Sequence, residues 1–560
     1  MHRSHRRLAG FGIGTGVMLA AIVGGGTQAA FAVDPDDLES RVTVAGVMNH
    51  LEALQSIADA NAGNRAIGTP GYEASGEYIE SVLEAAGYSP VRQDFQATTQ
   101  AIDEYEITLL GVTTDSDSVD PAPARVPMEG TTETDPAGIV GAELVAPTTA
   151  TGCSAADWAG ADATGKVAVV SRGICAFSEK SLAAADAGAI ALLVYNNEDG
   201  PLNGTLGEQL PEYIPSIGIT QAEGAAVLAD LASPTPQTVD LLVQETTTTV
   251  DTFNIIAETP NSTVKDNVVM LGAHLDSVPE GPGINDNGSG SAAILETAVQ
   301  LAASGTINNT VRFAWWGAEE VGLVGSTHYV DDLVENDPAA LDEIATYLNF
   351  DMVGSPNYVI SVYDANESSF PAPVEVPEGS IATEAALTDY FDSIGQPWID
   401  TAFDGRSDYD AFIANDVPAS GLFTGADDVK TAEQVSLFGG TAGITHDPNY
   451  HQAGDDIENI SPEALRISLG AIASVTASLA NDTSAINGVV PPVTEVPPTT
   501  TPSVVEPAAD GTAALAATGA DDALALAPLG LLVMATGVVL VGVRMRAGAR
   551  AATARTDSRE

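Results

Sequence analysis

The sequence predicts an α/β protein with a mixed, mostly parallel central sheet that helices flank. Three apolar segments of strand type, 268–271, 311–315 and 346–350, are each followed by polar residues and then by a helical pattern. This alternation of strands and helices favours a central sheet that is largely buried. At 560 residues the chain is also too long for one ordinary domain, so we expect two or more.

Both ends of the chain are expected to lie outside the folded domains. Residues 2–7 are basic, 8–26 are apolar, and a small-residue cleavage site ends at Ala32, which predicts a signal peptide over 1–32 and export by the Sec or the twin-arginine route. At the other end, 523–543 carries no charge and is long enough to span a bilayer. The arginines of the basic tail that follows would stay on the cytoplasmic side.

The segment 515–519, LAATG, resembles the LAxTG wall-sorting signal of actinobacterial sortases. The resemblance implies that a sortase cuts after Thr518 and joins it to peptidoglycan, which makes 515–560 a sorting signal and the protein a wall-anchored one. The alternative is a simple membrane anchor formed by 523–543. In either case, we expect the chain to contact the membrane only through this C-terminal segment. Residues 486–514, rich in Pro and Thr, are expected to form an extended wall spacer.

The expected mature chain is strongly acidic. Residues 33–518 keep 12 of the 20 lysines and arginines and 73 of the 77 acidic residues, which leaves a net charge near −61. Such a charge argues against nucleic acid as a partner and favours solubility. Cys153 and Cys175 are the two cysteines of the chain, and an even pair in an exported protein predicts a disulfide.

The first folded segment, 33–126, is expected to hold helices and strands without catalytic residues. Apolar residues recur at helical spacing over 44–62 and 72–86, and 91–95 and 105–110 have strand character. We interpret this segment as scaffold.

From 127 to 247 the pattern changes to that of a β-rich α+β domain. Short strand-like runs alternate with Gly-rich turns and one Ala-rich helix at 178–187. The run GKVAVVSRGICAF at 165–177 resembles protease-associated (PA) domains. The resemblance implies an inserted module without catalytic residues that shapes access to a neighbouring site or binds partners. A purely structural insertion is the alternative.

Histidines and acidic residues follow all three apolar strands of the next segment, 248–485. Such strand ends are where α/β proteins collect ligands, and these residue types bind divalent metals. Each polar residue alone has an ordinary explanation, such as a glutamate pair on a solvated face or an aspartate that caps a helix. Such explanations do not account for polar residues after all three strands together with a distant histidine. The candidate metal ligands are His274, Asp286, Glu320, Asp351 and His451.

The number of ligands indicates two metal ions. If Asp286 bridges, each ion receives three protein groups and keeps an open position, as catalytic zinc does. Two such ions can share and deprotonate a water and polarise a carbonyl. Glu319 is then placed as the general base for that water, and Asp276 as the acceptor for the second ring nitrogen of His274.

These segments resemble the secreted bacterial di-zinc aminopeptidases of metallopeptidase family 28, of the leucyl-aminopeptidase type. The matching motifs are GAHLDS at 272–277, GINDNGSG at 283–290, WWGAEEVGLVGS at 315–326, NFDMVG at 349–354, FDGRSDYDAF at 403–412, GLFTGA at 421–426 and NYHQAGDDIENI at 449–460. The resemblance implies the zinc exopeptidase fold for 33–126 and 248–485, two Zn²⁺ per chain, and extracellular removal of N-terminal residues from peptides and proteins.

The resemblance also implies further site residues. Tyr450 would donate to the oxyanion, and Arg406 and Phe423 would bind substrate, although Arg406 is equally suited to a structural ion pair. A cis peptide bond is expected between Asp286 and Asn287. Some relatives close the loop around the last histidine with cysteines, where this chain has Asn449 and Gly454. The calcium site of other relatives is not matched in this sequence.

Two groups of alternatives remain open. Within the same fold they are a zinc carboxypeptidase, a dipeptidase or a glutaminyl cyclase, and the complete set of ligands for a second metal argues against the cyclase. From another class, the chain would be a wall-anchored binding protein or adhesin that uses the PA-like module. Metal content together with one peptidase assay separates an enzyme from a binding protein.

Overall fold

Two sheets organise the chain in the computed structural model, which describes residues 33–491 except 117, 119–124, 198–199, 203, 208 and 373. The large sheet has the strand order β14-β13-β15-β12-β10-β11-β9-β1-β2, with β4 paired to β9, and the small sheet has the order β3-β8-β7-β6-β5. The predicted signal peptide, the predicted wall spacer from residue 492 onward, and the predicted sorting signal with its membrane span lie outside the described residues.

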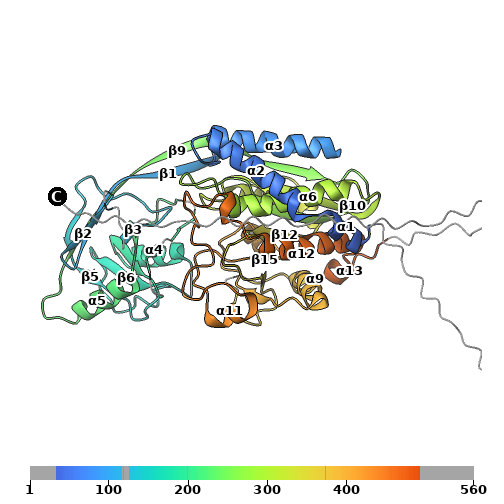
Figure 1. The fold of residues 1–560 in the computed structure, drawn as a ribbon. Coiled ribbons are helices and arrows are strands. Elements are labelled where there is room, and N and C mark those ends of the chain that lie inside the picture. Colours follow the sequence, from blue (N-terminus) through green and yellow to red (C-terminus); the bar gives the residue numbers. More distant parts are fainter. Residues whose placement is uncertain are drawn as a thin grey trace, which may run out of the picture. The chain divides into compact units, whose positions relative to one another are not determined.

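The large sheet, several of whose strands are labelled in Figure 1, is parallel in its centre. It is antiparallel from β11 through β9 and β1 to β2, and β13 also pairs antiparallel with β15 on the other side. Its strands are β1 (Val91–Leu109), β2 (Val112–Asp115), β4 (Ile139–Ala142), β9 (Val239–Glu258), β10 (Ser262–His274), β11 (Ile307–Trp316), β12 (Ile344–Asp351), β13 (Ser361–Tyr363), β14 (Ile399–Thr401) and β15 (Ala419–Phe423). The four central strands, β15, β12, β10 and β11, pair in parallel. The predicted mixed α/β sheet is thereby confirmed.

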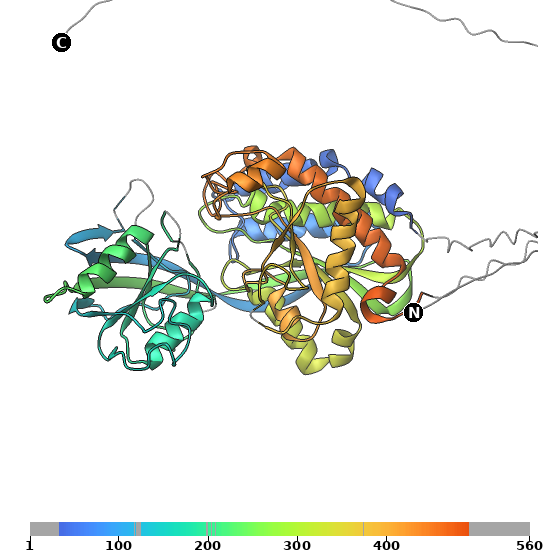
Figure 2. The ribbon, with the colours of Figure 1, turned by 90° about the horizontal axis from the view of Figure 1, so that it is seen from below.

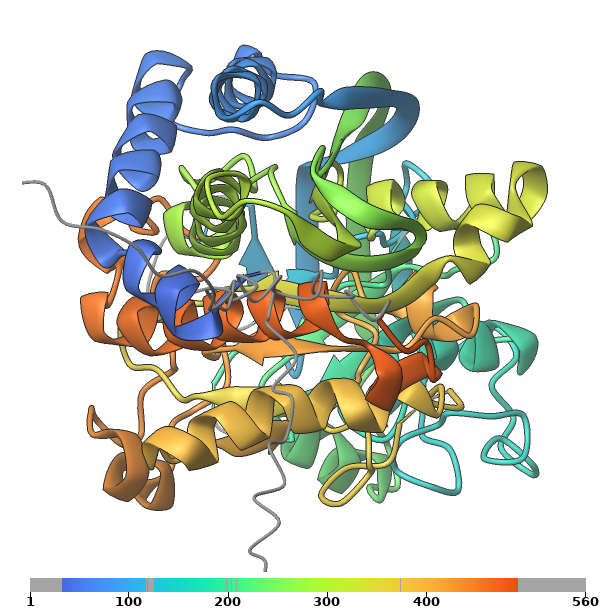
Figure 3. The same ribbon diagram turned by 90° about the vertical axis from the view of Figure 1, so that its right-hand side faces the viewer.

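Helices cover both faces of this sheet (Figure 3). They are α1 (Pro35–Arg41), α2 (Val44–Ala60), α3 (Pro70–Ala86), α6 (Gly290–Ala302), α7 (Val324–Asn336), α8 (Pro338–Asp342), α9 (Gly379–Ile394), α10 (Asp410–Ala414), α11 (Ala432–Phe438), α12 (Pro462–Asn481) and α13 (Ser484–Asn487), with a π-helical turn η1 (Ile284–Ser289) and a 3₁₀ turn η2 (Ile457–Asn459). The larger core joins the sheet to α2, α3, α6, α9 and α12, and a second core joins it to α7 and α10.

The central strands are apolar throughout because both of their faces are buried. In β10, Val269 and Leu271 point into the larger core, while Met270 between them points into the second core. Side chains alternate along a strand, so a strand covered on both sides needs apolar residues at every position. This explains the uninterrupted apolar run at 268–271.

Local sequence sets the ends of the scaffold helices. Thr69 accepts a hydrogen bond from the amide of Tyr72 at the start of α3, Pro70 occupies the first turn, and Gly87 ends the helix at a φ of 96°. Within the described residues, α12 alone has the length and apolar composition to cross a membrane. Most of that apolar stretch is buried inside the protein, where α12 packs on α1, α6 and β11.

A long two-stranded ribbon connects the large sheet to the inserted lobe (Figure 2). β1 and β9 pair antiparallel from Val91 opposite Ile256 to Thr108 opposite Asp240. The lobe holds β3 (Arg125–Pro127), β5 (Leu144–Val145), β6 (Val167–Ser171), β7 (Ala191–Tyr195) and β8 (Ser216–Ile219), with α4 (Phe177–Asp186) and α5 (Gln221–Leu231). Its core includes Ile107 and Leu109 of β1, so its packing begins before residue 127.

The predicted disulfide is present in this lobe. Cys153 and Cys175 are joined by an S–S bond of 2.02 Å. The ammonium group of Lys180, which is fully buried, donates to the carbonyls of Thr151 and Gly173 beside the bridge.

Candidate metal centre

The carboxyl ends of the parallel strands bring predicted ligands to one edge of the large sheet. β10 ends at His274 and β12 ends at Asp351, and His274 lies opposite Trp316, the last residue of β11. Glu319 and Glu320 follow β11 after two intervening residues. The strand ends thus place a histidine and three carboxylates together, as the sequence predicted.

Two loops complete the group. The turn η1 buries Asp286, and the peptide bond from Asp286 to Asn287 is cis, which confirms that prediction. His451 comes from the loop that precedes η2, where its backbone adopts a φ of 56°.

Three carboxylates converge on the Nε2 atom of His274. This nitrogen lies 3.2 Å from Oδ1 of Asp286, 3.5 Å from Oδ1 of Asp351 and 3.8 Å from Oε2 of Glu319. His274 and the three carboxylates are buried. Burial alone would lower the pKa of His274, but Glu319 and Asp351 outweigh it and hold that pKa well above its usual value.

A second histidine meets the other oxygen of Asp286. His451 Nε2 lies 3.3 Å from Oδ2 of Asp286 and 3.0 Å from Oε2 of Glu320. Asp286 therefore presents one oxygen to each histidine, the arrangement expected of a carboxylate that bridges two cations.

The donor atoms of this group fit divalent cations. Oε1 of Glu320 is buried and has no hydrogen-bond partner within the described part of the chain. Oδ1 of Asp351 and Nε2 of His451 are also buried and form no well-aligned hydrogen bond, although charged groups lie 3.0–3.5 Å away. Burial, with the charge of Asp286, raises the pKa of Glu320 to about 8. Buried unpaired acceptors and crowded carboxylates are costly, and cations bound between them would remove both costs.

Asp276 is placed differently from the sequence-based prediction. Its carboxylate Oδ1 lies 3.8 Å from Nδ1 of His274, whereas its main-chain oxygen lies 3.1 Å from that nitrogen. The carboxylate instead accepts the amides of Glu319 and Glu320, each at 3.3 Å. The reason is the chain path, because the turn after β11 brings these two amides over the carboxylate. Asp276 thus orients the glutamate pair, and its backbone orients His274.

Tyr450 and Arg406 lie together beside His451. The ring of Tyr450 stacks on that of His451 with centroids 3.8 Å apart, and Arg406 Nη2 lies 3.5 Å from the Tyr450 hydroxyl. Arg406 also pairs with Asp427 at 3.5 Å. Arg406 therefore forms the ion pair considered from the sequence and also lies next to Tyr450, whereas its role in binding substrate stays a prediction.

Phe423 ends β15 and lies opposite Asp351 in the parallel pairing with β12. Its side chain is half-buried against the second core. Phe423 therefore occupies the strand position next to Asp351, a predicted metal ligand.

Sequence reasoning missed a relay of polar side chains behind Asp351. The Ser407 hydroxyl donates to Oδ2 of Asp351 at 2.7 Å, and the amide of Asn349 donates to Ser407 Oγ at 2.8 Å. Asn349 in turn accepts from the Tyr347 hydroxyl at 2.9 Å. The polar side chains at alternate positions of β12, Tyr347, Asn349 and Asp351, were the available signal.

Hydrogen bonds take the place of a disulfide in the loop around His451. Asn449 donates to Asn459 at 2.7 Å, and Asn459 donates to Asp447 and Asp455. Asp455 also accepts the amides of Asn285 at 2.9 Å and Asp286 at 3.0 Å. The loop is thus fastened directly to the turn that carries Asp286.

His446 lies in the same loop as His451, five residues earlier, but takes no part in the ligand group. It is buried, and burial together with Lys430 lowers its pKa to about 4. The positive φ of Gly425 lets the chain pass against its ring, which the sequence pattern does not reveal.

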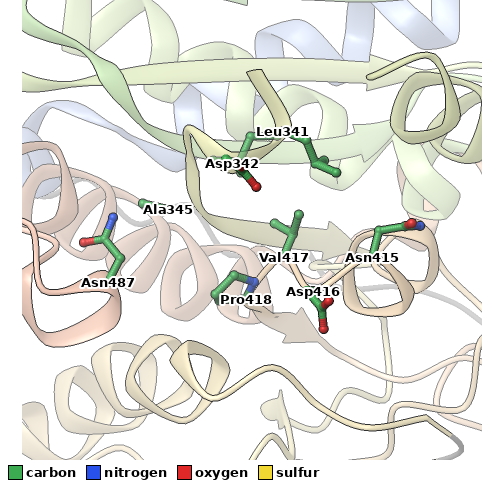
Figure 4. A pocket seen from close by; sticks show the side chains of 9 residues that line it. Leu341, Asp342, Ala345, Asn415, Asp416, Val417, Pro418 and Asn487 are labelled. Atoms are coloured by element: carbon green, nitrogen blue, oxygen red, sulfur yellow. The ribbon is translucent and has the colours of Figure 1, made fainter. Parts of the chain in front are cut away.

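Two other features lie apart from the metal-binding edge. A pocket opens at the amino ends of β12 and β15, lined by Leu341, Val417, Pro418 and Asn487 (Figure 4). A further group of carboxylates, Asp364, Glu384 and Asp400, accepts hydrogen bonds from the loop 364–370. We assign no ion to it.

Comparison with known proteins gives two family matches. The family described as Peptidase family M28 matches residues 254–476, and the PA domain family matches 140–227. The second match falls inside the predicted insertion, 127–247.

The chain is similar to named aminopeptidases over most of its length. It is 43% identical to the probable lipoprotein aminopeptidase LpqL of Mycobacterium tuberculosis, over 84% of this chain and 90% of that protein. It is 42% identical to leucine aminopeptidase 2 of Trichophyton rubrum, over 80% and 86%.

Solved structures show the same architecture. The aminopeptidase from Aneurinibacillus sp. strain AM-1 superposes with a TM-score of 0.60 at 27% identity, over 79% of this chain and 95% of that one. The zinc aminopeptidase BSAP from Bacillus subtilis superposes with a TM-score of 0.53 at 25% identity, over 79% and 97%.

Proposed function

Because this chain belongs to peptidase family M28 and is a zinc-type aminopeptidase with an inserted PA domain, we propose that it uses two zinc ions and Glu319 to release N-terminal residues from peptides outside the cell. The observation that carries the proposal is the placement of Asp286, which presents one oxygen to His274 and the other to His451. A bridging carboxylate between two histidines is what a two-metal site needs.

The described side chains divide into two ligand sets. His274, Asp286 and Asp351 would hold one ion, and His451, Asp286 and Glu320 the other. When bound, zinc polarises the scissile carbonyl and lowers the pKa of water. No calcium ion is included in this proposal.

Glu319 would act as the general base. Its carboxylate is buried at the edge of the ligand group, where Oε2 lies 3.8 Å from Nε2 of His274. A carboxylate in this position can accept the proton of a water held between the two ligand sets. Glu319 would take the proton from the attacking water and return it to the amine that leaves. Asp276 would hold Glu319 in place through its amide.

The other side chains would bind the substrate. The Tyr450 hydroxyl, next to Arg406, would donate to the oxyanion that forms at the scissile carbonyl. Phe423, beside Asp351, would contact the N-terminal side chain. Free N-termini of peptides and proteins are the proposed substrates.

Two measurements test the proposal. Removal of metal with a chelator should abolish release of the chromophore from an aminoacyl arylamide, and zinc should restore it. Glu319→Gln should keep about two zinc ions per chain and lower kcat by roughly 10²–10⁴-fold. Glu258→Gln, which alters a surface ion pair with Arg312, is the matched control. Full activity of Glu319→Gln would refute the assigned base.

The location is proposed from the two ends of the chain. Export with cleavage after Ala32, and attachment of Thr518 to peptidoglycan by a sortase, would place the enzyme in the cell wall. Without sorting, 523–543 would hold it in the membrane. Mass spectrometry of the N-terminus and of wall fragments tests this, and recovery of an intact 519–560 tail from the wall fraction would contradict it.

A further inference from the structure

Arg65 is a buried cation beneath the loop that links two of the ligands. The loop 275–283 runs from the end of β10 to η1, and so joins His274 to Asp286. Arg65 lies between α2 and α3 and is fully buried, yet it forms no ion pair with a carboxylate in the described ranges of the chain. Its charge must therefore be stabilised in another way.

The guanidinium group is fixed by three backbone carbonyls of this loop. Nε donates to Pro282 at 2.8 Å, and Nη2 donates to Gly283 at 2.5 Å. Nη1 donates to the carbonyl of Leu275, the residue after His274. A buried carbonyl without a donor costs about 1–3 kcal/mol, so one side chain satisfies three groups that the loop cannot pair by itself.

Backbone contacts add to this attachment. The amide of Arg65 donates to Ser277 Oγ at 2.9 Å, and its carbonyl accepts from the amide of Ser277 at 3.4 Å. At Gly283, whose φ is 60°, a Cβ atom would lie 3.1 Å from Nη2 of Arg65 and 2.5 Å from Ser277 Cβ. The loop is therefore shaped around the guanidinium group.

The surroundings of Arg65 are those of the metal site. Burial lowers its pKa to about 10, against the opposing charges of Asp276, Asp455, Glu320 and Asp286, so it stays protonated at neutral pH. Asp455 holds the turn η1 that follows this loop, because its carboxylate accepts the amides of Asn285 and Asp286. A cation thus fixes the carbonyls of the loop 275–283, and an anion fixes the amides of the adjoining turn.

We propose that Arg65 is a positioning residue that holds the loop 275–283 in the shape that presents His274 and Asp286 to the metals. It sets the zinc affinity without touching an ion. The inference rests on the proposed two-metal site and adds to it a residue of the N-terminal scaffold.

The test compares variants of two buried arginines. Arg65→Met removes both the charge and the guanidinium N–H donors. Arg65→Lys keeps a positive charge but cannot donate to all three carbonyls in the same geometry. Arg125→Met is the matched control, because Arg125 is also buried and donates to three backbone carbonyls, those of Ile107, Leu109 and Val112, in the inserted lobe. Zinc affinity is measured by competition with a chromophoric chelator, and ligand geometry by the visible absorption of the Co²⁺ form.

Both Arg65 variants should bind zinc roughly 10–100-fold more weakly and change the Co²⁺ spectrum, whereas Arg125→Met should lower only Tm. Hydrogen exchange of 275–289 should accelerate in the Arg65 variants alone. Wild-type affinity and spectrum in a folded Arg65 variant would overturn the inference. Failure of both Arg65 variants to fold while Arg125→Met folds would also overturn it, in favour of a structural role. Wild-type protein that binds no zinc would refute the proposed function as well.

Discussion

Tyr450 can serve as a donor because it keeps its proton. Burial raises the pKa of its hydroxyl well above 10, although Arg406 opposes this. The hydroxyl lies near Arg406, and the ring is held by the stack on His451. A neutral hydroxyl in a fixed position is suited to a charge that forms only in the transition state.

Tyr450→Phe should therefore reduce kcat more than it changes KM. We expect a decrease in kcat of roughly 10²–10³-fold, the usual effect of losing one oxyanion donor. Zinc content should stay at the wild-type level, because the hydroxyl is not one of the proposed ligands. Tyr105→Phe, in β1 near the inserted lobe, is the control. An unchanged kcat would remove Tyr450 from the mechanism.

His446 predicts a pH dependence of stability. Its pKa falls from 6.5 to about 4 on folding because the ring is buried and lies near Lys430. Between these pH values the unfolded chain binds a proton and the folded chain does not. The contribution of the neutral ring is therefore complete above pH 6.5 and is lost as the pH falls toward 4.

Urea unfolding at pH 7 and pH 5 measures this effect. Wild-type protein should lose about 2 kcal/mol more than His446→Gln between these values. Zinc-loaded samples keep the metal site constant in the comparison. Equal losses in the two proteins would show that His446 is protonated in the folded state.

At the scale of elements, α6 must lie close to β12 for the ligands to meet. Gly290 begins α6, and a Cβ atom there would lie 2.0 Å from the carbonyl oxygen of Phe350 and 2.4 Å from Oδ1 of Asn287. Phe350 precedes Asp351, and Asn287 follows Asp286. A side chain at position 290 would therefore displace the backbone next to two predicted ligands, Asp351 and Asp286.

Gly290→Ala should lower stability by about 1–3 kcal/mol and weaken zinc binding, because the neighbouring backbone must move. Gly470→Ala is the control, since the Cβ there would meet the Tyr390 hydroxyl, the movable tip of a side chain. Thermal unfolding with and without zinc measures both effects. A Gly290→Ala protein that is as stable as Gly470→Ala would contradict this account.

The elements differ in how far the sequence predicts them. The buried strands and their ligands were predicted, because burial on two faces leaves a long apolar run that ends in polar residues. β1 was predicted as two short strands, yet it is one strand, Val91–Leu109. Its middle pairs with β9 in an exposed ribbon, so it has no apolar alternation to detect.

The missing parts of the site have a similar cause. Ser407 and Arg65 act through hydrogen bonds to residues far away in the sequence, Asp351 and the loop 275–283. Spacing along the chain contains no trace of such contacts. Arg65 was interpreted as part of a scaffold segment for this reason.

Several of the few lysines and arginines of this acidic protein are buried and bind backbone carbonyls. The chain has 20 lysines and arginines against 77 acidic residues. Among the described residues, four of these cations are buried, namely Arg65, Arg125, Lys180 and Lys430, and all four donate to backbone carbonyls. Burial lowers the pKa of Arg65, Lys180 and Lys430, and nearby carboxylates oppose this effect at Arg65 and Lys180.

The inserted lobe should be separable from the catalytic residues. Every proposed ligand and substrate-binding residue lies outside 100–247, and the lobe has cores of its own. The lobe also contacts the catalytic part through an ion pair, in which Arg172 lies 3.6 Å from Asp428. Thr99 and Thr248 are paired in the ribbon, so an Asn-Gly turn can join them and keep the part of the ribbon that belongs to the large sheet. The shortened protein should fold, bind two zinc ions and hydrolyse an aminoacyl arylamide at the wild-type rate.

Longer substrates then reveal what the lobe does. If the lobe shapes access to the site, the shortened protein should change KM for peptides of several residues and leave kcat for the arylamide intact. If the shortened protein has wild-type kinetics on both the arylamide and the peptides, the lobe is a structural insertion. A folded, zinc-loaded protein that has lost arylamide hydrolysis would contradict the separation, because the lobe would then supply part of the active site.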